Sequence, residues 1–134
     1  MAAAGEVRVL AAAEWRAALD EAAAGFRGQT GLAVSVEYAE GGSALEALLG
    51  GAAADVFLPE GAAGTAGLKE AGRASSVSRN VVVKGRGEEG GEAEYVAATV
   101  PTECGNRTGG KLFVDYLSGE PGRAIWRAHG FEVP

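Results

Sequence analysis

The chain has 134 residues, of which 47% are hydrophobic, and it carries a formal net charge of −6 at pH 7. This length and hydrophobic content suit one domain with a real core and exclude a chain that is disordered throughout. The acidic balance and the lack of a Lys/Arg cluster argue against a nucleic-acid partner, whereas a small anion can still be bound by backbone N–H groups.

Strands and helices alternate along most of the sequence. The pattern predicts, in chain order, a strand at 6–13, a helix at 14–26, a strand at 32–38, a helix from 43 to 50, a strand at 54–59, a weak helix at 60–71, strands at 79–85 and 94–101, and helices from 106 or 108 to 117 and from 121 to 130. The strand at 32–38 alternates apolar and polar residues, which favours one better-buried face. Ser43 and Glu46 match the S-x-x-E capping box, with Ser43 as the N-cap.

This alternation indicates an α/β fold with a single open sheet and helices on both faces. We expect a five-stranded mixed sheet of four parallel strands and one antiparallel strand. The antiparallel strand, at 94–100, should pair with 80–84, because their short connection permits a hairpin and not a crossover. Residues 1–134 then form one α/β lobe, and the Gly- and Glu-rich segment 86–93 is, by itself, a solvated loop.

Three segments follow the carboxyl ends of predicted strands, where open α/β sheets bind their ligands. They are Ala13-Glu14-Trp15, Glu40-Gly41-Gly42-Ser43 and Leu58-Pro59-Glu60-Gly61. The second segment suits a tetrahedral oxyanion, because two glycines admit a ligand close to the backbone, a helix N-terminus offers free N–H groups and Ser43 adds a hydroxyl. The same residues also fit an ordinary capped helix start, which is far commoner.

Another glycine pattern, GNRTGGK at 105–111, matches the G-x-x-x-x-G-K of a phosphate-binding loop and lies between a strand and a helix. It would predict an NTPase, but Leu112 stands where the Mg²⁺-binding Ser or Thr should be, so the match is incomplete. Cys104 and His129 are the only residues of their types, which excludes an internal disulfide and leaves no persuasive Ser/His/Asp set. We therefore expect no catalytic residues, no metal site and no cofactor.

Several segments together resemble a known family. VRVLAAAEW, TGLAVSVEYAEGGSALEALLGGAAADVFLPE and RNVVVKG are similar to the N-terminal part of the molybdate/tungstate-binding proteins of ABC transporters, and EYVAATVPTECGNRTGGKLFVDYLSGEPGRAIWRAHGFEVP is similar to their C-terminal segment. The resemblance covers nearly the whole chain. It implies a type II periplasmic binding protein with two α/β lobes, an oxyanion in the cleft between the lobes, and a membrane permease as partner.

The chain departs from the family pattern at two points. Residues 86–93 stand where the second lobe should be, so the chain resembles the first lobe only. The first of the family's two serines falls at Glu14, whereas Ser43 matches the second; a carboxylate about 4 Å from an oxyanion repels it by roughly 1–4 kcal/mol. The oxyanion-binding residues that the resemblance implies are Ser43, Gly42, Ala13, Glu14 and Pro59. We expect weak or absent binding of molybdate, tungstate or sulfate.

Two functions follow from these observations. The first is a solute-binding lobe related to molybdate or tungstate transport, periplasmic by family resemblance. The second is an interaction or structural module, a degenerate or engineered half-protein that forms a homodimer through its exposed cleft face. The N-terminal MAAAGEVRV lacks the features of a signal peptide and no apolar run approaches membrane-spanning length, which suits a mature, a cytoplasmic or a recombinant form.

Overall fold

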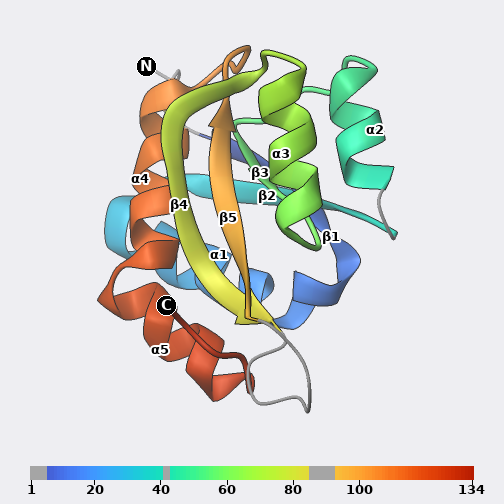
Figure 1. Cartoon of the computed structure of the whole chain (residues 1–134). Helices are drawn as coiled ribbons and strands as arrows, with labels where there is room; N and C mark the ends of the chain where they lie inside the picture. Colours follow the sequence, from blue (N-terminus) through green and yellow to red (C-terminus); the bar gives the residue numbers. More distant parts are fainter. Residues whose placement is uncertain (1–5, 41–42, 85–92) are drawn as a thin grey trace.

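A five-stranded sheet with helices on both faces forms the molecule in the computed structural model, which describes residues 6–40, 43–84 and 93–134 (Figure 1). In chain order the elements are β1 (Glu6–Ala12), the 3-10 helix η2 (Ala13–Trp15), α1 (Arg16–Thr30), β2 (Ala33–Ala39), α2 (Ser43–Leu49), β3 (Val56–Leu58), α3 (Ala62–Glu70), β4 (Ala74–Lys84), β5 (Glu94–Pro101), α4 (Arg107–Ser118) and α5 (Glu120–Ala128). The predicted α/β class and order of elements are confirmed.

The strand order across the sheet is β2-β1-β3-β5-β4. β1 pairs in parallel with β2 and β3, and β5 pairs antiparallel with both β3 and β4, which gives two parallel and two antiparallel pairs. Lys84 is the register partner of Glu94, so the predicted antiparallel pairing of the fourth and fifth strands is confirmed. The segment at 86–93, which is predicted to take the place of a second lobe, lies, apart from its last residue, outside the described residues.

One face of the sheet is covered by α1, α4 and α5, which bury the larger part of the core against β1, β3 and β5. Phe26 of α1 meets Phe113 of α4 edge-to-face, with ring centroids 5.1 Å apart, and Trp15 meets Trp126 of α5 at 5.6 Å. All four rings are almost completely buried. Each buried ring contributes roughly 1.5–3 kcal/mol to folding, so this face supplies much of the stability.

The opposite face carries α2 and α3, which pack Leu48 and Leu68 against Leu10 and Phe57. This second core is smaller than the first. α3 lies beside β5, and β4 curves past it with no helix in front (Figure 1). Part of this face of the sheet is therefore open.

β4 is longer than its prediction, because it begins at Ala74 and not at residue 79. Its ladder with β5 is irregular between Ala74 and Ser78 and again between Asn80 and Val82, as expected of bulges in an edge strand. The Ser-rich start of this strand has the composition of a loop, which explains the missed residues. β3 is shorter than its prediction and ends at Leu58.

Candidate solute site at the carboxyl edge of the sheet

The carboxyl ends of the parallel strands bring two of the three predicted segments together. η2 continues from β1 and contains Ala13, Glu14 and Trp15, and Pro59 directly follows β3. The buried Trp15 indole Nε1 donates a hydrogen bond of 2.9 Å to the Pro59 carbonyl, which ties the two segments to each other. We call the region formed by 13–15, 59–62, Lys84 and Glu94 the carboxyl edge.

Lys84, at the end of β4, supplies a cation to this edge. Its Nζ donates to the Glu60 carbonyl oxygen at 2.8 Å and lies 3.2 Å from Oε2 of Glu14. The same ammonium lies 5.6 Å from the centroid of the Trp15 ring, within the range of a cation–π contact. The Glu14 carboxylate is thus half of an ion pair, and no local sequence pattern indicates its partner 70 residues away.

Glu94, at the start of β5, occupies the N-terminus of α3. Its Oε2 accepts a hydrogen bond of 2.7 Å from the backbone N–H of Ala62, the first residue of that helix. A carboxylate is stabilised there by the free N–H groups and the helix dipole. The chain therefore places one of its own anions where a helix N-terminus could otherwise meet a solute.

Ser43 forms its contacts within its own turn. α2 begins at Ser43 itself, and the hydroxyl donates to the Glu40 carbonyl at 2.5 Å. The predicted role of Ser43 as N-cap is therefore wrong, because the residue is the first of the helix and its hydroxyl is used as a donor. Among the described residues, no hydrogen bond or ion pair links Ser43 to Glu14. Gly42 lies outside the described residues.

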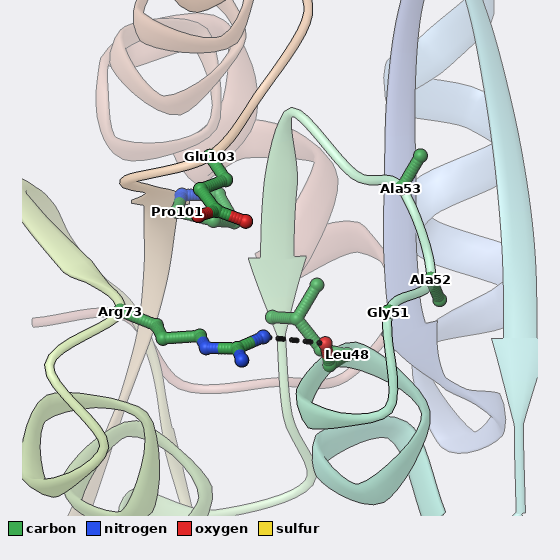
Figure 2. Close-up of a pocket in the computed structure, with 7 residues that line it drawn as sticks. All are labelled: Leu48, Gly51, Ala52, Ala53, Arg73, Pro101 and Glu103. Atoms are coloured by element: carbon green, nitrogen blue, oxygen red, sulfur yellow. Dashed lines mark hydrogen bonds between the residues drawn. The ribbon is translucent and has the colours of Figure 1, made fainter.

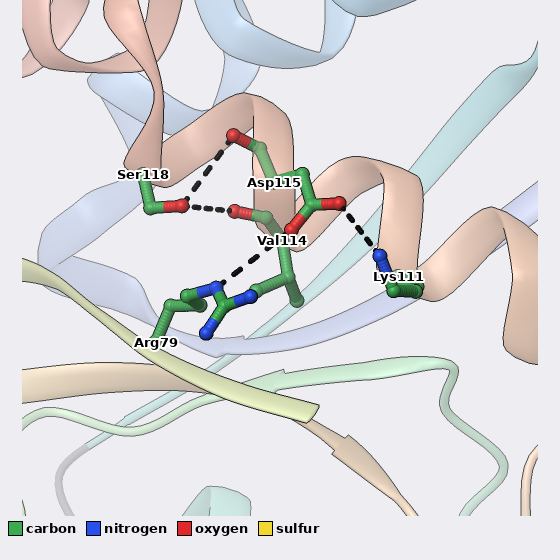
Figure 3. A network of polar contacts seen from close by, with 5 residues as sticks. All are labelled: Arg79, Lys111, Val114, Asp115 and Ser118. Atoms are coloured by element: carbon green, nitrogen blue, oxygen red, sulfur yellow. Dashed lines mark hydrogen bonds and ion pairs between the residues drawn. The ribbon is translucent and has the colours of Figure 1, made fainter. Parts of the chain in front are cut away.

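The GNRTGGK pattern forms the start of α4 and not a phosphate-binding loop. Asn106 caps the helix by accepting from the Gly109 N–H at 2.9 Å, as one of the two predicted caps. Lys111 pairs with Asp115 at 3.1 Å, and Asp115 also lies 3.8 Å from Nε of Arg79 (Figure 3). Most of the pattern is helical and its lysine is paired with Asp115, so the segment does not form the loop of free backbone N–H groups that binds phosphates. The NTPase interpretation is therefore not supported.

A pocket of about 210 Å³ lies at the opposite end of β5, where its lining includes Arg73, Pro101 and Glu103. Figure 2 shows Arg73 reaching across to Leu48, whose carbonyl oxygen accepts from Nη1 at 3.4 Å. A cation beside the last carbonyls of a helix stabilises that helix end. We assign Arg73 this structural role at the end of α2.

The single cysteine and histidine have structural surroundings. Burial raises the pKa of the Cys104 thiol, an effect that Arg107 partly opposes, so the thiol is protonated at neutral pH and a poor nucleophile. His129 Nε2 lies 2.8 Å from Oε1 of Glu21 and links α5 to α1.

Across the described ranges, no group of three or more His, Cys, Asp or Glu residues is placed to hold a metal ion. No helix in the part of the chain that the structure describes has the length and apolar character of a membrane span.

Comparisons with known proteins agree with this architecture. Residues 7–87 match the family model described as bacterial extracellular solute-binding protein. The fold matches the periplasmic molybdate-binding protein of Azotobacter vinelandii with a TM-score of 0.85 at 13% identity, over 96% of this chain and 99% of that chain. It matches the substrate binding domain of a putative molybdenum ABC transporter from Clostridium difficile with a TM-score of 0.87, also at 13% identity and over 96% and 99% of the two chains.

A third solved structure is similar in fold at lower scores. PEB3 with bound L-phospholactate gives a TM-score of 0.69 at 11% identity, over 96% of this chain and 100% of that chain. No curated protein sequence matches the chain. At these identities the solved structures establish the fold alone.

Proposed function

Because the chain belongs to the bacterial extracellular solute-binding protein family, we propose that it is a solute-binding module related to molybdate and tungstate uptake by ABC transporters. Its solute site is the carboxyl edge, where Glu14, Pro59 and Lys84 converge from three different parts of the chain. That convergence is the observation that supports the site most directly. A periplasmic or extracellular place of action and a membrane permease as partner follow from the family resemblance.

We propose further that the chain supplies one wall of such a site. Every strand among the described residues belongs to one sheet. Lys84 and Glu94 are register partners, and only residues 85–93 connect them, a segment far shorter than a domain. A second wall would have to come from another chain or a second copy.

The charges at this edge oppose tight oxyanion binding. Glu14 already pairs with Lys84, and Glu94 already occupies the N-terminus of α3. An oxyanion must therefore compete with two carboxylates of the chain itself for the donors that would hold it. An uncompensated carboxylate about 4 Å away costs an anion roughly 1–4 kcal/mol, and the neighbouring ammonium of Lys84 places the cost at the lower end.

The test is calorimetric titration of the protein with molybdate, tungstate and sulfate. We expect weak or undetectable heat for the natural sequence. Glu14→Ser restores the hydroxyl of the family pattern and frees Lys84, and we expect its affinity for molybdate to rise about tenfold, equivalent to about 1.4 kcal/mol. Glu14→Gln frees Lys84 without adding a serine hydroxyl, so the difference between the two variants measures what the hydroxyl contributes.

Glu103→Ser is the matched control, because Glu103 is an exposed carboxylate at the other end of β5. Equal affinity in all four proteins would rule out the carboxyl edge as an oxyanion site. Size-exclusion chromatography of the same samples addresses the interaction module: a dimer that is indifferent to all three oxyanions would favour that alternative over solute binding.

A further inference from the structure

A groove of about 560 Å³ lies between α3 and the strands β4 and β5, on the sheet face that the helices cover only in part. Figure 1 shows β5 in this face, with α3 on one side and the curved β4 on the other. Ala62 and Ala66 of α3 and Ala97 of β5 line the groove. Their side chains are too small to fill the space, so the groove is built into the sequence. Its volume is within the range of small-molecule sites.

Thr65 lines the groove with a hydroxyl that has no partner. The residue is only 8% exposed, and its Oγ1 has no hydrogen bond. A buried hydroxyl without a partner costs roughly 1–3 kcal/mol and is uncommon in folded proteins. Because this oxygen has less than 1 Å² of accessible surface, a polar ligand in the groove supplies the partner only once the Thr65 side chain turns its hydroxyl towards the groove.

Three more polar side chains in the lining are unused. Lys69, Ser76 and Asn80 form no side-chain hydrogen bond or ion pair with any described residue, and all three line the groove. Their neighbours differ: the Ser75 hydroxyl donates to the Val100 carbonyl at 2.6 Å, and Ser78 shares a hydrogen bond of 2.9 Å with Thr99. Lys69, Ser76 and Asn80 are exposed, so they are solvated in the unliganded protein and accessible to a ligand, whereas the hydroxyls of Ser75 and Ser78 are used in structural bonds.

The charge of the groove identifies the class of ligand. Lys69 is the one charged residue among its described lining residues, in a chain whose net charge is −6. Lys69 lies four residues after Thr65 on α3, so the two side chains share one face of the helix. The β4 wall adds the Ser76 hydroxyl and the Asn80 amide, which bind hydroxyl groups well.

We propose that this groove binds a small hydroxylated carboxylate, such as a sugar acid. Lys69 holds the carboxylate, Ser76 and Asn80 hydrogen-bond to hydroxyl groups, and Thr65 gains a partner by turning its hydroxyl towards the ligand. The groove shares Ala62 with the carboxyl edge but uses none of the ion pairs there, so the outcome of its test does not depend on the oxyanion site.

The probes are gluconate, sorbitol and acetate, added to ¹⁵N-labelled protein while amide chemical shifts are recorded. Gluconate carries one carboxylate and several hydroxyls, sorbitol has hydroxyls without charge, and acetate has charge without hydroxyls. We expect gluconate to shift the amides of Thr65, Ser76 and Asn80 in a saturable way. Sorbitol and acetate should each bind at least tenfold more weakly, a difference of about 1.4 kcal/mol.

Two lysine variants test the assignment of the carboxylate. Lys69→Gln should weaken gluconate binding about tenfold or more, while Lys111→Gln, which changes a lysine paired with Asp115 outside the groove, should leave it unchanged. The amide spectrum of each unliganded variant confirms that it is folded. The proposal is overturned by any of three results: no saturable shifts at the groove, equal binding of sorbitol and gluconate, or unchanged affinity in Lys69→Gln.

Discussion

Replacing Asp55 with alanine should destabilise the protein strongly. Asp55 is 3% exposed, and its two carboxylate oxygens accept backbone N–H groups from different elements, Arg8 of β1 and Asn106 before α4, both at 2.8 Å. Asp55→Ala leaves both part-buried backbone donors without their protein partner. At roughly 1–3 kcal/mol for each unsatisfied donor, the loss is about 4 kcal/mol, a large fraction of the roughly 5–15 kcal/mol by which native proteins are stable.

Urea unfolding followed by circular dichroism measures this loss. With a slope of about 1.5–2 kcal/mol per molar urea, the midpoint should fall by about 2–3 M. Asp55→Asn keeps one acceptor oxygen and should lie between the natural protein and the alanine variant. Asp115→Ala removes an exposed carboxylate with two ion-pair partners and should change stability by about 0–1 kcal/mol. A loss for Asp55→Ala no larger than that of Asp115→Ala would refute the reasoning.

Three further predictions concern the fold around the two candidate sites. Gly110→Ala would place a Cβ 2.5 Å from a backbone oxygen of the segment before β3 and should destabilise the protein by about 1–3 kcal/mol. Gly28→Ala lies in the last turn of α1, where the new Cβ meets nothing within 4 Å, and should stabilise the protein by about 0.5–1 kcal/mol. Thermal melts of the two variants test both predictions. Asn106→Ala removes the α4 cap and should cost about 1 kcal/mol in urea unfolding, with Asn106→Ser retaining most of the stability. Burial, and then the hydrogen bond to the Asp20 carboxylate, raises the pKa of Tyr38, so the folded state favours the protonated phenol. The contribution of Tyr38 to stability is complete below the unfolded pKa of about 10 and is lost as the pH rises from there towards the folded pKa. The stability difference between the natural protein and Tyr38→Phe should therefore be constant from about pH 8 to about pH 9 and shrink between about pH 10 and about pH 11; an unchanged difference at pH 11 would count against this coupling.

The periodicity of the sequence was sufficient to predict the helices and strands and the antiparallel hairpin of β4 and β5. Alternation along 32–38 predicted the half-buried β2, and Asn106 was correctly named as a cap because its amide can accept from a helix N–H. These features depend on residues within a few positions of each other. The order of strands in the sheet depends on distant residues: β5 lies between β3 and β4, and no local pattern specifies β3 as a neighbour of β5.

The candidate site shows the same division between local and distant information. Sequence reasoning named Glu14 and Pro59, because both lie at the carboxyl ends of predicted strands. It missed Lys84 and Glu94, whose roles depend on partners 70 and 32 residues away in the chain. It also assigned the Ser43 hydroxyl to a helix cap, where it would accept, and to an oxyanion, where it would donate, whereas the hydroxyl donates to Glu40, three residues earlier.

The contact between Glu14 and Lys84 changes the interpretation of the weak oxyanion binding that the sequence predicts. From the sequence alone, a carboxylate replaces a hydroxyl and simply repels the ligand. In the structure the carboxylate is paired at 3.2 Å, and both side chains are partly exposed, so an oxyanion that displaces it gives up an ion pair worth about 0–1 kcal/mol. The proposed absence of a second wall is a larger obstacle. A ligand in a half-open site forms fewer contacts but loses about as much translational freedom as in a closed site, so its binding free energy is less favourable. We therefore expect substitutions at Glu14 to raise the affinity only modestly, and tight binding to require a second protein surface over the carboxyl edge.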